Sequence, residues 1–167
     1  NLQKQLTTNS ESDASPTVSP DGRYIAFESL RSGYEHIWRM DSNGDNVVQL
    51  TTGKRDKAPQ FSADGNWVVY SSYTTSEPTL WKVPVTGGRA VQLTNEYSAM
   101  PDVSPDGKWI ACLYRDKDSS PVMTMAIIPF EAGKPTKIFA PPANGVSNVR
   151  WTRDGRGLSF SSNRDGA

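Results

Sequence analysis

Short apolar runs alternate with polar, turn-forming residues along most of the chain. The clearest runs lie at 24–27, 67–70, 109–112 and 158–160, and each follows an Asp-Gly pair. Aromatic and β-branched residues bounded by Gly, Pro, Asn and Asp are typical of β-strands. No segment keeps a 3.6-residue period, so the pattern predicts an all-β protein without helices.

Two markers repeat with one period. The first is a turn written S-P-D-G, S-A-D-G, S-P-D-G and T-R-D-G, with its aspartates at 21, 64, 106 and 154, so the spacings are 43, 42 and 48. The second is Gln-Leu-Thr at 5–7, 49–51 and 92–94, with 137–139 in the equivalent place. A shared period in two independent markers indicates a tandem repeat protein.

Each unit predicts four antiparallel strands, because a third strand follows the apolar run and a Gly-bearing turn leads to a fourth strand. Four such strands form one blade of a β-propeller, and blades stack because one blade cannot bury both of its faces. We expect one propeller segment over 1–167. Its parts are the last strand of a preceding blade (1–8), three blades (14–52, 57–95 and 100–140) and an incomplete blade (147–167).

Large residues recur at fixed places in the units, and we interpret the tryptophans as packing between blades. The third unit departs from the pattern. It carries Met125 where the others carry Trp38 and Trp81, and Phe139 where they carry Thr.

The stretch S-P-D-G-R-Y-I-A-F-E-S, followed by H-I-W-R-M-D-S-N-G and V-Q-L-T, resembles the TolB-type, WD-repeat-like propeller repeat. The resemblance covers essentially the whole chain. It implies a propeller that binds a protein or peptide, in a periplasmic or otherwise extracytoplasmic compartment. Similar repeats accompany bacterial serine/threonine kinases and peptidases, which leaves an accessory or sensor propeller of a larger enzyme as the alternative.

About four blades would be few for a closed ring. Two arrangements remain open: the chain is part of a six- or seven-bladed ring, or copies of it assemble to close a larger ring. Uncovered strand edges and blade faces predict self-association when the chain is studied by itself.

Composition removes several classes of function. Eighteen basic and eighteen acidic residues give a net charge of zero, which argues against a nucleic-acid partner. No apolar run approaches the roughly 20 residues of a membrane span, so we expect no membrane insertion. The single cysteine, Cys112, lies in an apolar run and predicts a buried thiol.

We predict no catalytic, cofactor-binding or metal-binding residue. His36 is the only histidine and has no neighbouring motif that would make it a general base. The segment 41–46 resembles the start of a calcium loop, but Asn46 stands at its sixth position and Thr52 at its twelfth, so we interpret it as a turn. A channel enzyme is a third alternative, for which Asp102 is the only candidate acid.

Function is expected in the loops between the second and third strands and in the segments that lead into each blade, since binding residues concentrate on such loops. We therefore expect a non-enzymatic scaffold that binds a protein or peptide. The expected contact residues are Arg31, Tyr34, Arg55, Asp56, Tyr73, Tyr97, Arg115 and Asp116.

Overall fold

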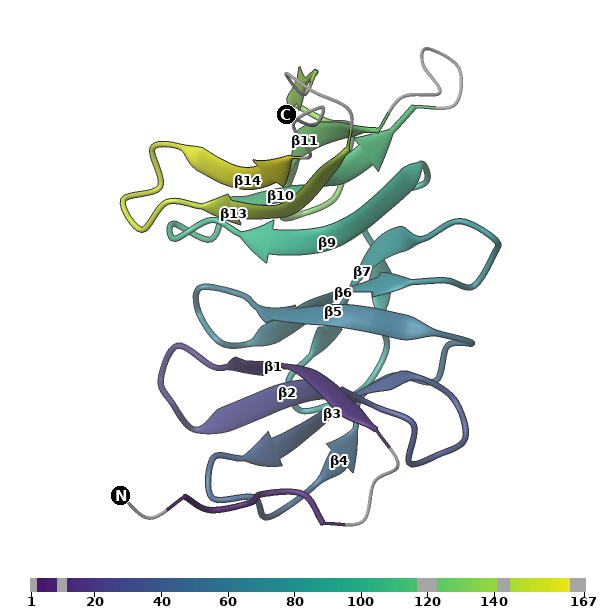
Figure 1. The fold of residues 1–167 in the computed structure, drawn as a ribbon, viewed down its shortest axis with the longest axis vertical. Helices are drawn as coiled ribbons and strands as arrows, with labels where there is room; N and C mark the ends of the chain where they lie inside the picture. The colour runs from purple at the N-terminus through teal and green to yellow at the C-terminus, as the bar shows by residue number, and fades with distance from the viewer. Residues whose placement is uncertain (1–2, 9–11, 117–122, 141–144, 163–167) are drawn as a thin grey trace, which may run out of the picture.

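The computed structural model describes residues 3–8, 12–116, 123–140 and 145–162, which form antiparallel sheets and no helix (Figure 1). Three sheets have four strands each, and within every sheet the strands follow one another in chain order. The first comprises β1 (Asp13–Val18), β2 (Tyr24–Ser29), β3 (His36–Asp41) and β4 (Val48–Gln49). The second comprises β5 (Asp56–Phe61), β6 (Trp67–Ser72), β7 (Thr79–Pro84) and β8 (Val91–Gln92).

The third sheet comprises β9 (Tyr97–Val103), β10 (Trp109–Arg115), β11 (Thr124–Pro129) and β12 (Lys137–Phe139), and the last comprises β13 (Val146–Trp151) and β14 (Leu158–Ser162). The first strands β1, β5, β9 and β13 lie next to one another in that order, so the sheets radiate from a shared inner side (Figure 1). The predicted blades of a β-propeller are thereby confirmed. Among the described residues no helix exists that could cross a membrane.

The Asp-Gly turns share one hydrogen-bond pattern and stack from blade to blade. Ser19 Oγ donates to Asp21 Oδ1 at 2.6 Å and accepts from the Tyr24 amide at 2.9 Å. Each turn glycine has a positive φ, 71° at Gly65, which an L-residue adopts at a cost. A Cβ at Gly65 would lie 3.6 Å from Cδ of Pro20 in the turn before it. Turn glycines therefore provide both a backbone angle and a close blade-to-blade contact.

Lowering the pH is expected to weaken these turns. The hydrogen bond from Ser19, followed by that from the Arg23 amide, lowers the pKa of Asp21 to about 2, and the pKa values of Asp64, Asp106 and Asp154 are lowered in the same way. An unfolded aspartate titrates near 3.9. Because the folded pKa is the lower one, the stabilisation is complete above about pH 4 and is lost as the pH falls toward about 2.

Acid titration followed by tryptophan fluorescence checks this. An Asp21→Asn variant should show a shallower loss of stability between about pH 4 and 2 than the wild-type chain. An unchanged slope would contradict a role for the turn carboxylates.

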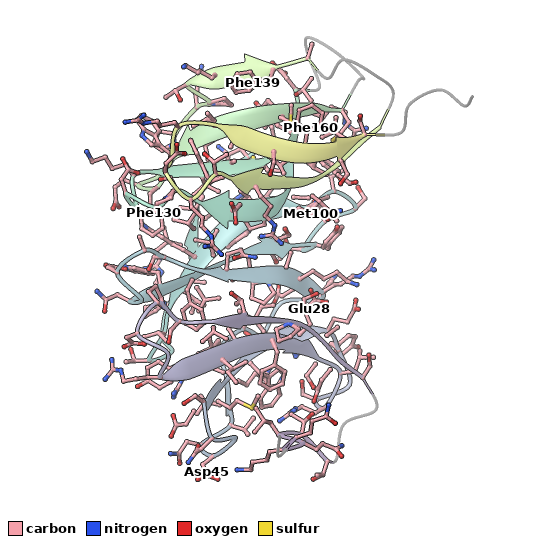
Figure 2. The ribbon with its side chains drawn as sticks, turned by 60° about the vertical axis from the view of Figure 1, so that its left-hand side comes forward. Glu28, Asp45, Met100, Phe130, Phe139 and Phe160 are labelled. Atoms are coloured by element: carbon pink, nitrogen blue, oxygen red, sulfur yellow. The ribbon has the colours of Figure 1, made fainter. Side chains whose placement is uncertain are left out.

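Each innermost strand contains a bulge, and in the second and third blades the blade before it holds the bulge in place. Ser15, Ala58, Met100 and Asn148 all have φ between 51° and 55°, at equivalent places in β1, β5, β9 and β13. The Ala58 amide donates to Glu28 Oε1 at 2.7 Å, and the Met100 amide donates to Ser71 Oγ at 3.0 Å. Figure 2 shows Glu28 and Met100 along this inner side. The second strand of one blade thus holds the first strand of the next.

The hydrophobic core lies between blades rather than within them. Ile37 and Leu50 of the first blade pack with Val68 and Val83 of the second. Val69 and Leu80 of the second blade pack in the same way with the third, together with Ile110, Cys112 and Ile128. Burial raises the pKa of the Cys112 thiol to about 12, in agreement with the buried thiol that the sequence predicts.

Strand register corrects two equivalences in the third blade. Ala126 pairs with Cys112 and Ile138, as Trp81 pairs with Tyr70 and Gln92. Ala126 therefore holds the tryptophan position, and the assignment of Met125 to it is wrong. Phe139 likewise stands at the position of Leu93 and not of Thr94. A shift by one residue moves a side chain to the opposite face of a sheet. Matching Met125 and Phe139 to the other blades by side-chain size alone therefore placed both on the wrong face.

The first and last units differ from the complete blades. Residues 3–8 form no strand, contrary to the strand expected over 1–8; Lys4 Nζ instead donates to the Asn43 carbonyl at 2.6 Å. The four units begin with strands at 13, 56, 97 and 146, up to three residues before the predicted boundaries.

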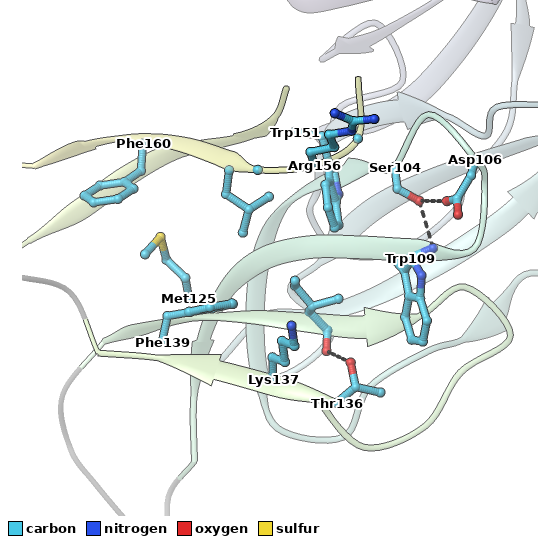
Figure 3. A pocket seen from close by; sticks show the side chains of 14 residues that line it. Ser104, Asp106, Trp109, Met125, Thr136, Lys137, Phe139, Trp151, Arg156 and Phe160 are labelled. Carbon is cyan, nitrogen blue, oxygen red and sulfur yellow. Dashed lines mark hydrogen bonds between the residues drawn. The ribbon is translucent and has the colours of Figure 1, made fainter. Parts of the chain in front are cut away.

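A cavity of about 670 Å³ lies between the third blade and the two-stranded sheet (Figure 3). Met125, Phe139 and Phe160 line it. Phe139 is 37% exposed, although Leu50 and Leu93 at the same position are only 7% and 3% exposed. Phe139 and Phe160 lie together at this end of the molecule (Figure 2).

Candidate partner-binding face

Ion pairs join neighbouring blades on the loop face, which we define as the face opposite the Asp-Gly turns. Glu35, in the loop after β2, accepts hydrogen bonds from Arg55 Nε and Lys57 Nζ of the second blade, each at 2.7 Å. Burial opposes ionisation of Glu35, but the bonds from Lys57 and Arg55 outweigh it and lower the pKa. Glu77, in the loop after β6, accepts from Arg115 at the end of β10. Each loop carboxylate therefore reaches the following blade.

Both arginines also stack on tyrosines. The guanidinium of Arg55 lies 5.1 Å from the ring centre of Tyr73, and that of Arg115 lies 5.0 Å from the ring centre of Tyr97. Burial, followed by the Tyr73 hydroxyl, raises the pKa of Tyr97. We call these four residues the Arg–Tyr strip. Arg55 and Tyr73 belong to the second blade, and Tyr97 and Arg115 belong to the third. The strip presents flat cationic and aromatic groups, which are typical anchors of protein contacts.

Two other expected contact residues are not part of the strip. Tyr34 is 64% exposed, and its ring centre lies 6.3 Å from that of His36. Asp116 borders a hollow between the second and third blades.

Arg31 is enclosed within the first blade. Its guanidinium lies over the rings of Phe27 and Trp38, at 4.9 and 5.0 Å, and pairs with Asp13 at 3.2 Å. Only 15% of its side chain is exposed. The structure therefore gives Arg31 a packing contact inside the blade, and the expected contact surface does not include most of its side chain.

Asp56 is not exposed, which corrects its place among the contact residues. Its side chain is fully buried, accepts a hydrogen bond from Ser72 Oγ at 2.6 Å and accepts another from the Gly53 amide at 3.1 Å. The run Arg55-Asp56-Lys57 reads as a polar loop in the sequence, but β5 begins at Asp56, and strand alternation turns this carboxylate inward.

His36 connects the first blade to the segment that leads into the second. Nε2 donates to the Gly53 carbonyl at 2.7 Å, because a carbonyl can only accept. Nδ1 then accepts from Ser32 Oγ at 2.7 Å and from the Gln49 amide at 3.0 Å. Both ring nitrogens are thus engaged within the fold.

The other candidate oxygen groups also have contacts within the fold. Asp41 Oδ2 accepts from the Asn46 amide group at 2.6 Å, and Gly44 has φ of 97°, so 41–46 forms a hairpin turn. Asp102 accepts from Arg150 at 3.0 Å and from the Trp151 amide at 2.6 Å, which ties the third blade to the last sheet. Within the described ranges, no three His, Cys, Asp or Glu side chains are grouped as a metal site would require.

Sequence reasoning missed the acidic partners of the strip, Glu35 and Glu77. Glu35 precedes its arginine by 20 residues and Glu77 precedes its arginine by 38, so the two pairs share no spacing that a repeat search could find.

Comparison with known proteins places the repeats in a family. Residues 2–122 match the family model described as the dipeptidyl peptidase IV (DPP IV) N-terminal region, which is more than half of the chain. The chain belongs to this family. An uncharacterized protein of Agrobacterium fabrum is 38% identical to it over 50 residues, which are 30% of this chain and 17% of that protein.

Solved structures agree on the fold of this DPP IV N-terminal-region member. TolB from Acinetobacter baumannii superposes with a TM-score of 0.77 and 24% identity, over 92% of this chain and 38% of that one. A TolB candidate from Agrobacterium tumefaciens gives 0.69 and 23%, over 78% and 50%. Puromycin hydrolase gives 0.69 and 16%, over 86% of this chain and 24% of that one. The repeats are thus TolB-like propeller repeats, and the chain spans half or less of the length of these relatives.

Proposed function

We propose that the chain is a non-enzymatic propeller scaffold that binds a protein or peptide on its loop face. The observation that carries the proposal is the Arg–Tyr strip, in which two stacked arginine–tyrosine pairs are held by neighbouring blades of a rigid sheet scaffold. Half of the Arg55 side chain (52%) is exposed, so its guanidinium can contact a partner without leaving Tyr73. Stacked, paired side chains lose little rotamer freedom on binding, which favours affinity.

Site-specific photo-crosslinking tests this proposal. A photoreactive phenylalanine at Tyr34 or Tyr73 is expected to capture the same protein in the cells that make this chain. The same group at Lys108, which is exposed on the turn face, is expected to capture none. Arg55→Ala should lower the yield at Tyr73 about tenfold, the size of a modest interface anchor. Capture at Lys108 alone would contradict the loop face as the binding surface.

A second candidate function follows from the family match and the fold shared with puromycin hydrolase. In it, the propeller is an accessory or sensor part of a larger enzyme such as a peptidase. Purifying the protein from its own cells under denaturing conditions and mapping its peptides distinguishes the two. Peptides of a covalently attached catalytic domain would favour the accessory function, and propeller peptides alone would favour the scaffold.

Self-association is proposed for the 167-residue chain by itself. Phe139 and Phe160 are each 37% exposed beside the large cavity, and β14 pairs with β13 alone among the described strands. Burying such an apolar end against another copy is favourable by about 25 cal/mol per Å². Sedimentation velocity at increasing concentration should show a rising mean mass, and a strictly monomeric mass would contradict the proposal.

A further inference from the structure

The outer edge of the third blade differs from those of the other two complete blades at one register position, where it carries isoleucine and they carry glutamine. β12 pairs only with β11 among the described strands, as β4 and β8 pair only with β3 and β7. At the centre of β12, Ile138 is 53% exposed. Gln49 and Gln92 occupy the same register position, and their amides donate to the carbonyls of Thr51 and Thr94. The third blade therefore presents an exposed isoleucine on an open strand edge, which natural proteins usually avoid.

A hollow of about 600 Å³ adjoins this edge. It lies between the second and third blades and includes Leu93, Tyr114 and Ile138 in its lining. Both blades are complete four-stranded sheets, so the hollow does not correspond to a missing strand. An apolar side chain placed beside Ile138 would be buried against Leu93 and Tyr114.

Charges of opposite sign lie at the two ends of the hollow. Lys134 lies at the end near the turn between β11 and β12, and Glu96 lies at the end near the loop face. Burial, then the charges of Asp116 and Glu96, raise the pKa of Tyr114, so the Glu96 carboxylate acts on the hollow. No described residue forms an ion pair with Glu96. A basic group at the Glu96 end would be complementary to it.

We propose that the outer edge of β12 and this hollow bind an extended segment of a partner protein as an added strand. The segment places an apolar side chain against Ile138 and a lysine or arginine, two residues along, toward Glu96. Side chains two apart in a strand point to the same face, so one strand can satisfy both contacts while its backbone pairs with β12. This surface lies on the outer wall and does not depend on the Arg–Tyr strip.

Binding of a defined peptide to the 167-residue chain tests the proposal. The probe is a fluorescein-labelled, C-terminally amidated Thr-Val-Thr-Ile-Thr-Lys-Thr, measured by fluorescence anisotropy and by the methyl signal of Ile138 in NMR spectra. We expect saturable binding that shifts this signal. Ile138→Gln should weaken binding at least about tenfold while keeping the fold, because glutamine stands at this position in two blades.

Further substitutions separate the contribution of Glu96 to peptide binding from that of Ile138. Glu96→Gln should weaken binding of the lysine peptide and leave unchanged the binding of a peptide with norleucine in place of lysine. Val91→Thr, on the exposed edge of β8, should change neither. Equal binding to the wild type and to Ile138→Gln, or no binding at millimolar peptide, would overturn the proposal. An Ile138 signal that shifts only with protein concentration would also overturn it, because a second copy would then occupy the edge.

Discussion

Leu80→Ala is expected to destabilise the chain by about 2–5 kcal/mol, a large fraction of the stability of an ordinary domain. Leu80 is fully buried and lies at the centre of the core between the second and third blades. Truncation leaves a cavity that Val69 and Ile110, held in neighbouring strands, cannot fill. Urea denaturation followed by tryptophan fluorescence and by far-ultraviolet circular dichroism measures the loss.

Val91→Ala is the matched control. Val91 lies in β8, two residues before the buried Leu93, but is 42% exposed, so its truncation should change stability by less than about 0.5 kcal/mol. A loss below about 1 kcal/mol for Leu80→Ala would show that this core contributes little to stability.

Asp56→Ala is expected to cost about 2–3 kcal/mol, because it leaves the Ser72 hydroxyl and the Gly53 amide without acceptors in a buried site. Urea denaturation, followed by tryptophan fluorescence and circular dichroism as for Leu80→Ala, measures this loss of stability. The substitution weakens the junction between the first two blades, because Gly53 also accepts the hydrogen bond from His36 of the first blade.

Asp56→Ser provides the control for this site. Ser98 stands at the equivalent position of the third blade, where it pairs with Tyr114 as Asp56 pairs with Ser72. A serine hydroxyl oxygen can still accept one of the two hydrogen bonds that Asp56 accepts. The loss of stability should therefore be smaller than in the alanine variant. Equal losses in both variants would indicate that the volume of the side chain matters and its hydrogen bonds do not.

The repeat and its turns could be predicted from sequence because the local conformation requires particular residues. A positive φ in a tight turn favours glycine, and the Asp before it accepts hydrogen bonds from residues close in sequence, such as Ser19 and Arg23. The second strand of each complete blade, which directly follows this turn, could also be predicted, because an apolar run of that length favours a buried strand.

Positions that depend on strand pairing or on reach between blades could not be predicted. Whether Met125 or Ala126 replaces tryptophan is decided by their partners in β10 and β12 and not by residue type. The burial of Asp56 depends on where β5 begins. The pairing of Glu77 with Arg115 depends on how two loops approach each other in space. Each of these is a tertiary property.

The contact between successive turns has a consequence for how such proteins change over evolution. Ala63 lies 3.3 Å from the Cβ position of Gly107, and Pro105 lies 3.6 Å from that of Gly155, as Pro20 lies near Gly65. Every unit thus offers its second turn residue on one side and its glycine on the other. A duplicated gene segment of this length would therefore encode a unit whose turn can make the same contact with the units on both sides, so this part of the interface allows the number of blades to change.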